Sequence, residues 1–178
     1  MEKVGWHHVK WSPPELTFSQ PGMELDFGGI VKEYAVDRLA TFFREAGIVH
    51  GVINLGGDVR VVGPLPDGSP LRIGIRHPRH TDQSAQTVEL TQGAIASSGD
   101  YERCMVINGV RYGHILNPKT GWPVRHLAAV SVIGDFCVVA GSASTIAMLM
   151  EDKGPAWLAE LGFPHYWIST RGETGGMT

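Results

Sequence analysis

The pair Asn108-Gly109 places the strongest constraint on how this chain folds. It separates two short strand-like runs, Met105–Ile107 and Val110–Tyr112. Asn-Gly readily adopts the backbone angles of a two-residue hairpin turn, so we expect the two runs to pair as antiparallel strands. The sequence therefore predicts at least one β-hairpin in the second half of the chain.

Further strand-like segments are spread along the sequence. We expect strands within 4–18, interrupted by Pro13-Pro14, and over the segments 23–27, 51–55, 59–62, 71–75, 87–90, 129–133 and 166–169. Because such segments follow one another more often than they alternate with helices, the pattern favours hairpins and meanders over strand–helix–strand units.

Three helices are predicted between these strands. Helical spacing of apolar residues indicates one over 31–46, ended by Gly47. A nearly all-apolar helix is expected over 136–150 and a short one over 155–161, while the tail from Gly172 is expected to be irregular. We therefore predict an α+β fold, a mostly antiparallel sheet with helices packed on one side.

Bulk properties exclude several classes of protein. A length of 178 residues suits a single domain spanning 1–178, and the net charge of −3 argues against a nucleic-acid or anionic-membrane surface. No apolar run approaches the ~18 residues of a membrane span, and no secretory signal segment is visible, so the compartment stays open. Cys104 and Cys137 form no C-x-x-C pair and predict no zinc site.

Glycine is enriched, with 23 residues in 178, about 13% against a usual ~7%. The glycines cluster, which favours tight loops around a ligand. Gly28-Gly29 precedes a helix start at which free backbone N–H groups and Lys32 would meet an anion. A tight strand-to-helix turn without a ligand explains the same residues.

Two more segments carry candidate binding groups. Gly56-Gly57 follows a strand and precedes Asp58 and Arg60, whose guanidinium could clamp a phosphate. A β-bulge or hairpin turn is the alternative. Residues 96–103 offer hydroxyls, a possible backbone nest and the aromatic Tyr101, or else form a helix-cap turn.

His114 is the candidate catalytic residue. It ends an apolar strand just before a turn that Asn117, Pro118 and Gly121 would force. A strand end that opens into a rigid turn holds an imidazole still, as a general base requires. A strand-end histidine in an ordinary hairpin is the alternative.

Five of these segments, taken in order, resemble the FAD:protein FMN transferase family, also called ApbE-like. The matching blocks are Leu25–Asp37 (LDFGGIVKEYAVD), Asn54–Arg60 (NLGGDVR), Ser98–Arg103 (SGDYER), His114–Gly121 (HILNPKTG) and Ala140–Thr145 (AGSAST). The resemblance implies a T-fold-like α+β domain and a Mg²⁺-dependent reaction. In that reaction FMN passes from FAD to a Thr or Ser hydroxyl of a partner flavoprotein carrying a D-x-[ST]-[ST]-A-T motif, and AMP leaves.

The resemblance also implies roles for individual residues. His114 falls on the family's catalytic histidine, and the metal would be bound by the backbone carbonyl of Gly29 and the side chain of Thr145. The positions that match the family's flavin-nucleotide site are Gly28, Gly29, Lys32, Asp37, Gly56, Gly57, Asp58, Ser98, Gly99, Asp100 and Thr120.

The sequence departs from the family pattern in three places. Gly141 stands where the family has a metal-binding aspartate, and Glu33 replaces the more usual glycine after the lysine. Only about 25 residues precede the first block, so the chain is interpreted as N-terminally shortened relative to the family. A Mg²⁺-dependent FAD pyrophosphohydrolase, or a non-catalytic module that binds FAD or a partner, are the alternative functions.

Overall fold

A six-stranded, fully antiparallel sheet forms the centre of the protein in the computed structural model, which describes residues 2–177. The strand order is β12-β11-β10-β7-β4-β3. The strands are β3 (Gly51–Leu55), β4 (Asp58–Gly63), β7 (Gly93–Gly99), β10 (Leu127–Gly134), β11 (His165–Ser169) and β12 (Thr174–Met177).

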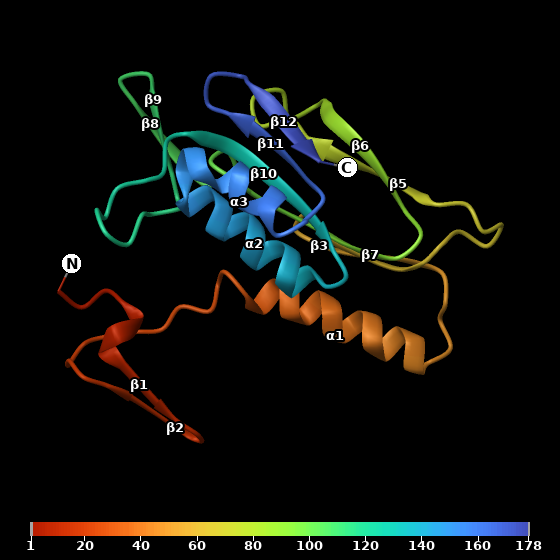
Figure 1. Ribbon diagram of the computed structural model, residues 1–178. Coiled ribbons are helices and arrows are strands. Elements are labelled where there is room, and N and C mark those ends of the chain that lie inside the picture. The colour runs from red at the N-terminus through yellow and green to blue at the C-terminus, as the bar shows by residue number, and fades with distance from the viewer. Residues whose placement is uncertain (1, 178) are drawn as a thin grey trace.

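One face of this sheet carries the helices (Figure 1). Helix α1 (Val31–Glu45) packs on β3 and β4, and α2 (Cys137–Leu149) packs on β7 and β10. A 3-10 turn, η2 (Glu151–Lys153), leads into the short α3 (Gly154–Glu160), which contacts α2 and β11. The predicted α+β class, with helices on one side of an antiparallel sheet, is confirmed.

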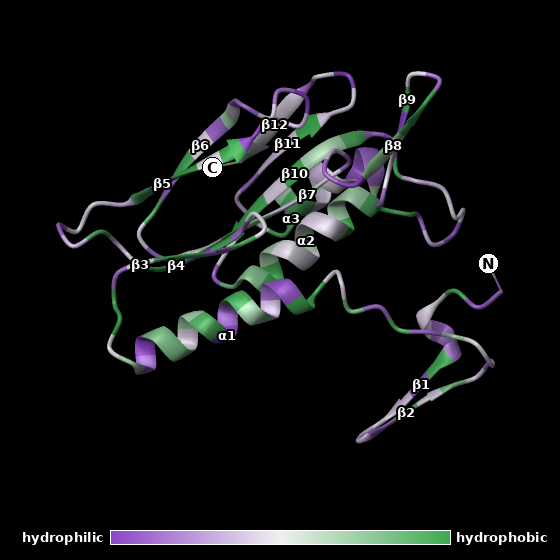
Figure 2. Cartoon of the chain, turned by 180° about the vertical axis from the view of Figure 1, so that it is seen from behind, coloured by the Kyte–Doolittle hydropathy of each residue, from purple (hydrophilic) through white to green (hydrophobic). Residues whose placement is uncertain are grey.

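Apolar side chains explain why the helices lie there. The larger core cluster joins small residues of α2, such as Ala140 and Ala147, to Val130 and Val132 of β10. Figure 2 shows this apolar character running along α2 and the strands beneath it. Alanines allow α2 to approach the sheet closely, so the predicted nearly all-apolar helix is confirmed as central to the core.

The hairpin β5 (Leu71–Arg76) and β6 (Ser84–Leu90) covers part of the opposite face. Ile75 and Val88 of the hairpin pack with Val59 of β4 and Ile95 of β7 in a separate cluster. Alternate residues of β4 and β7 therefore face opposite layers, as strand geometry requires. The hairpin forms a wall above the sheet rather than a further strand in it.

Two other hairpins lie at the periphery. The predicted pair is β8 (Cys104–Ile107) and β9 (Val110–Gly113), and Asn108 (φ 51°) and Gly109 (φ 76°) are both left-handed as expected. Near the N-terminus, the 3-10 turn η1 (Trp6–His8) precedes β1 (Val9–Ser12) and β2 (Glu15–Phe18). The β1–β2 hairpin stands apart from the central sheet (Figure 1).

Three local predictions are wrong. Residues 23–27 form no strand, because no partner strand lies beside them and Leu25 and Phe27 are exposed. The tail is not irregular but forms β12, whose Gly175 packs against the Trp167 ring. The turn expected within 96–103 starts only after Gly99, where β7 ends.

No helix in the described residues 2–177 is long and apolar enough to cross a bilayer.

Candidate functional site

A cleft of about 1290 Å³ lies between α1, the β3–β4 turn, β5, the end of β7 and the segment that follows β9. It exceeds the ~300–1,000 Å³ of common small-molecule sites, which leaves room for a dinucleotide. Nine of the residues predicted from the sequence line it: Gly28, Gly29, Lys32, Gly56, Gly57, Ser98, Gly99, His114 and Thr145. The first four blocks of the sequence and α2 therefore meet around one cavity.

His114 follows the last residue of β9 and is solvent-exposed. Its Nδ1 lies 3.2 Å from the carbonyl oxygen of Arg103. A carbonyl can only accept, so Nδ1 carries the hydrogen of the neutral ring and the lone pair is on Nε2. The predicted turn beyond it is present, since Gly121 N–H donates to Asn117 O at 2.8 Å.

The two glycine pairs present backbone to the cleft in different ways. Gly56 (φ 61°) and Gly57 (φ 97°) occupy left-handed conformations that other residues rarely adopt, and Asn54 Oδ1 accepts the Gly57 N–H at 2.9 Å. At the first pair, Gly28 N–H donates to Asp26 Oδ1 at 2.7 Å, whereas a Cβ at Gly29 would meet open space. A ligand can therefore approach the backbone closely at Gly29 and Gly57.

Lys32, which lines the cleft, forms an ion pair with Asp58, which is buried behind the lining. Lys32 Nζ lies 2.7 Å from Asp58 Oδ2, although without hydrogen-bond geometry. Asp58 is only 2% exposed, and its Oδ1 accepts the backbone N–H of Ser97 at 3.4 Å. The carboxylate thus connects the first turn of α1 to β4 and β7, and Lys32 is one of several basic side chains that line the cleft.

Three hydroxyl groups meet where β7 approaches α2. Ser98 Oγ lies 2.8 Å from Ser144 Oγ and 3.0 Å from Thr145 Oγ1. Ser98 and Thr145 line the cleft, while Ser144 is fully buried and donates to Gly141 O. This cluster places hydroxyl oxygens in the cleft within one helical turn of Gly141, whose neighbour across the helix interface is Glu33.

Asp37 lies outside the cleft lining. Its two carboxylate oxygens accept the backbone N–H groups of Cys137 (2.9 Å) and Val138 (3.0 Å). These are the first two residues of α2, so Asp37 caps that helix from α1. Arg60 Nε lies 3.8 Å from the same carboxylate and its guanidinium stacks on Phe136 at 5.0 Å.

The expectation that Arg60 clamps a phosphate in the cleft is therefore wrong. The residue is 5% exposed and points to the helix side of β4. Strand alternation explains the error, because Val59 faces the β5–β6 side and its neighbour must face away.

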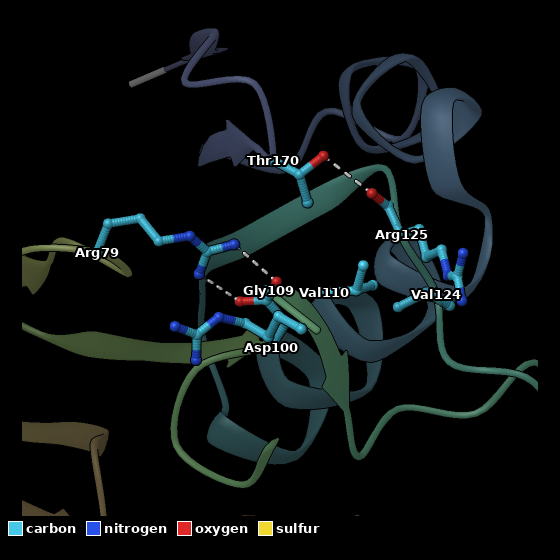
Figure 3. Close-up of a pocket in the computed structure, with 8 residues that line it drawn as sticks. Arg79, Asp100, Gly109, Val110, Val124, Arg125 and Thr170 are labelled. Carbon is cyan, nitrogen blue, oxygen red and sulfur yellow. Dashed lines mark hydrogen bonds and ion pairs between the residues drawn. The ribbon is translucent and has the colours of Figure 1, made fainter. Parts of the chain in front are cut away.

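Asp100 and Thr120 also lie outside the cleft lining. Asp100 binds Arg79 through two hydrogen bonds of 2.6 and 2.8 Å beside a smaller pocket that Val110 and Arg125 also line (Figure 3). Thr120 is exposed in the turn after His114, where its Oγ1 accepts the backbone N–H of Trp122. Both side chains have local structural partners.

Several cleft residues were not assigned to the site from sequence. Leu71 and Ile73 of β5 form part of the cleft wall, but the strand carries no motif that indicates this. Glu33 lines the cleft although its replacement of glycine was noted only as a departure. Its burial could have been predicted from helical spacing, since Val36 and Ala40 on the same face are buried.

The residues around Glu33 fit a hard cation. Within residues 2–177 no group of three or more His, Cys, Asp or Glu side chains gathers as a metal site. The donors at this end of the cleft are oxygens, from Glu33, Ser98 and Thr145, and magnesium prefers oxygen ligands to nitrogen or sulfur. Among the described residues no hydrogen-bond partner reaches Glu33 Oε2.

Comparison with known proteins identifies relatives of this chain. The sequence model of the ApbE family matches residues 1–167. A protein of Vibrio cholerae named FAD:protein FMN transferase is 34% identical over 156 residues, which cover 86% of this chain and 47% of the relative. A protein of the same name from Haemophilus influenzae is 32% identical and covers 78% of this chain and 41% of the relative.

Solved structures give the same relationship. The ApbE protein of Thermotoga maritima superposes with a TM-score of 0.89 at 32% identity, over 97% of this chain and 58% of the other. The flavin transferase ApbE of Vibrio cholerae gives 0.84 at 30% identity, over 98% of this chain and 57% of the other. The chain spans about half the length of the curated relatives it matches. With two thirds or more of its residues aligned in every one of these comparisons, the chain belongs to the ApbE family.

Proposed function

We propose that this chain, as one domain over residues 1–178, transfers FMN from FAD to a hydroxyl group of a partner protein. The observation that carries the proposal is that His114 and both glycine pairs line one cleft. The names of the relatives support the same reaction. Five separate sequence blocks that meet at one cavity are better explained by a shared ligand than by five unrelated turns.

His114 is the proposed general base. Its Nε2 accepts the proton of a Thr or Ser hydroxyl on the acceptor, whose oxygen bonds to the phosphorus of the FMN half of FAD. The bond between that phosphorus and the bridging oxygen breaks, and AMP leaves with the bridging oxygen. Positioned general bases contribute typically ~10²–10⁴-fold to rate.

The FAD would lie along the backbone of the paired glycines. Gly29 and Gly57 would let the diphosphate approach the chain closely, Gly28 and Gly56 shape the two turns, and Lys32 would offset part of the diphosphate charge. Ser98 and Gly99 would complete the phosphate side of the cleft. Leu71 and Ile73 offer an apolar surface for an aromatic ring of the dinucleotide.

Mg²⁺ is the proposed cofactor, with the Gly29 carbonyl and the Thr145 hydroxyl among its ligands. When bound, it would neutralise charge on the reacting diphosphate. The acceptor is proposed to be a flavoprotein segment with the motif D-x-[ST]-[ST]-A-T. Asp37, Asp100 and Thr120 remain second-rank candidates for FAD binding, because each already has a structural partner.

The test uses the 178-residue chain with FAD, Mg²⁺ and an acceptor peptide bearing that motif. Flavin fluorescence on the peptide and released AMP are the readouts, and His114→Ala should abolish both. His50→Ala is the matched control, because His50 Nδ1 also bonds a carbonyl, that of Pro64 at 2.8 Å, but the residue does not line the cleft.

Each outcome selects one function. Labelled peptide supports transfer. FMN and AMP without labelled peptide support an FAD pyrophosphohydrolase, in which water replaces the hydroxyl. FAD binding with neither product supports a non-catalytic module, and the absence of FAD binding overturns the proposal.

A further inference from the structure

The side chain of Glu33 on α1 lies against Gly141 on α2, in the space that a side chain at position 141 would occupy. A Cβ built at Gly141 would lie 2.7 Å from Glu33 Cγ and 3.1 Å from its Oε1. Glu33 therefore occupies the volume that any side chain at position 141 would need. The two positions are far apart in sequence, yet the position of the Glu33 side chain depends on residue 141 being a glycine.

The Glu33 carboxylate lies in an environment that an ordinary structural glutamate would not favour. The residue is 8% exposed, and among residues 2–177 no partner hydrogen-bonds its Oε2. Burial raises the pKa of this carboxyl, and the nearby Asp58 carboxylate adds to the effect. A buried, incompletely paired carboxylate costs folding free energy unless a ligand compensates it.

The helix dipole does not account for this burial. Glu33 lies in the first turn of α1, where a negative charge is favourable. A solvent-exposed carboxylate would gain that interaction without giving up its hydration. The helix dipole therefore gives no reason for Glu33 to be buried.

Two hydroxyl groups lie one helical turn along α2 from the Glu33–Gly141 contact. Thr145 follows Gly141 by four residues and shares its face of α2, and Ser98 lies 3.0 Å from Thr145 Oγ1. Glu33, Ser98 and Thr145 all line the cleft. The positive charge of Lys32 favours the ionised Glu33 carboxylate, but its Nζ is paired with Asp58 and forms no ion pair with Glu33 within the described residues.

We propose that Glu33 supplies, from α1, the carboxylate of a divalent-cation site whose α2 position is taken by Gly141. The proposal rests on the metal-dependent function proposed above, but it concerns one feature of its own: the acid and the glycine form a matched pair. The glycine gives Glu33 room to reach the site, and Glu33 supplies the negative charge that position 141 lacks. Thr145 and the hydroxyl of Ser98 complete its side-chain ligands.

The test measures metal binding by itself, with Mn²⁺ as the probe. Free Mn²⁺ is quantified by electron paramagnetic resonance during titration of the protein, with and without FAD. Glu33→Gln should weaken binding by at least ~10-fold, since loss of a group that only orients a ligand already costs ~10–100-fold. Glu45→Gln, on the exposed last residue of the same helix, should bind like the wild type.

Reciprocal substitutions test the pairing. Glu33→Gly alone should lose Mn²⁺ binding. Gly141→Asp alone should not bind more tightly, because its Cβ would overlap Glu33 Cγ and two carboxylates would crowd one space. The double variant Glu33→Gly/Gly141→Asp removes the overlap and should recover most of the affinity. Recovery in the double variant also shows that a chain carrying both substitutions still folds.

Three results would overturn the inference: no Mn²⁺ binding to the wild type in either condition, equal binding by Glu33→Gln, or no recovery in the double variant. A wild-type chain that binds Mn²⁺ through Glu33 but transfers no flavin would leave this inference intact and refute the proposed function. If Glu33→Gln instead transfers flavin and binds Mn²⁺ as tightly as the wild type, the proposed function stands and this inference is refuted.

Discussion

His114 donates its Nδ1–H to the carbonyl oxygen of Arg103, 3.2 Å away. Arg103 directly precedes β8 and His114 directly follows β9, so the bond lies at the open end of the β8–β9 hairpin. The bond selects one tautomer of the neutral imidazole and leaves Nε2 as the basic atom. The same hydrogen bond limits rotation of the imidazole ring, which is exposed to solvent. A backbone acceptor serves this purpose without placing a second charge beside the base.

The first prediction concerns that tautomer. In ¹⁵N-resolved NMR spectra above the pH at which the ring is charged, His114 should show a protonated Nδ1 and an unprotonated Nε2, the less common form in water. Assignment would come from the signal lost in His114→Ala. Because the ring is exposed, this variant should keep its free energy of unfolding within ~0.5 kcal/mol. A protonated Nε2 would contradict the assigned role.

The second prediction concerns Asp37. Asp37→Ala removes the acceptor of two N–H groups at the start of α2 and the carboxylate nearest to the buried Arg60. We expect the free energy of unfolding to fall by ~1–3 kcal/mol, measured by urea denaturation. Asp82→Ala, in an exposed loop, is the control and should change it by less than ~0.5 kcal/mol. Equal effects of the two substitutions would show that the cap adds no stability.

Most elements of the fold could be predicted from local sequence patterns. The Asn108-Gly109 turn and the two long helices were predictable because each depends on residues adjacent in sequence. Strand β12 was not, since Gly175 and Gly176 have no side chains to alternate and the strand exists only through its pairing with β11. The error at 23–27 is the reverse case, an alternating pattern that finds no partner strand.

The candidate site divides in the same way. Motifs indicated His114 and the glycine pairs, because a turn and a strand end are local features. The cap by Asp37 on α2 and the overlap of Glu33 with Gly141 join segments about a hundred residues apart. Such relationships arise when two helices pack side by side, and no pattern within one segment predicts them.

The third prediction distinguishes the two cysteines, which are both free thiols. Burial raises the pKa of the Cys137 thiol to about 12, and the residue is fully buried, whereas Cys104 is half-buried. At pH 8 only on the order of 10⁻⁴ of Cys137 would be thiolate, the reactive form. Iodoacetamide should therefore label Cys104 alone in the folded protein and both after denaturation. The folded Cys104→Ser variant should carry no label, as measured by mass spectrometry. Label on Cys137 in the folded protein would contradict its burial.

The last prediction follows from the raised pKa of Glu33. In the unfolded chain this carboxyl titrates near its ordinary value of 4.5, and in the folded protein it titrates higher, chiefly because of burial. The folded state therefore favours the protonated form. Its contribution to stability is fully present below pH 4.5 and is lost as the pH rises through the folded pKa.

Glu33→Gln keeps the shape and removes this titration. With metal chelated by EDTA, the variant should gain stability relative to the wild type as the pH is raised from about 4.5 to 8, measured as the difference between their urea midpoints. Mn²⁺ added in excess over the EDTA should then stabilise the wild type at pH 8 more than the variant, because a ligand that binds only the folded state raises its stability according to its affinity. If the variant is instead less stable than the wild type at pH 8 without metal, the Glu33 carboxylate holds α1 in place and is not kept for a cation.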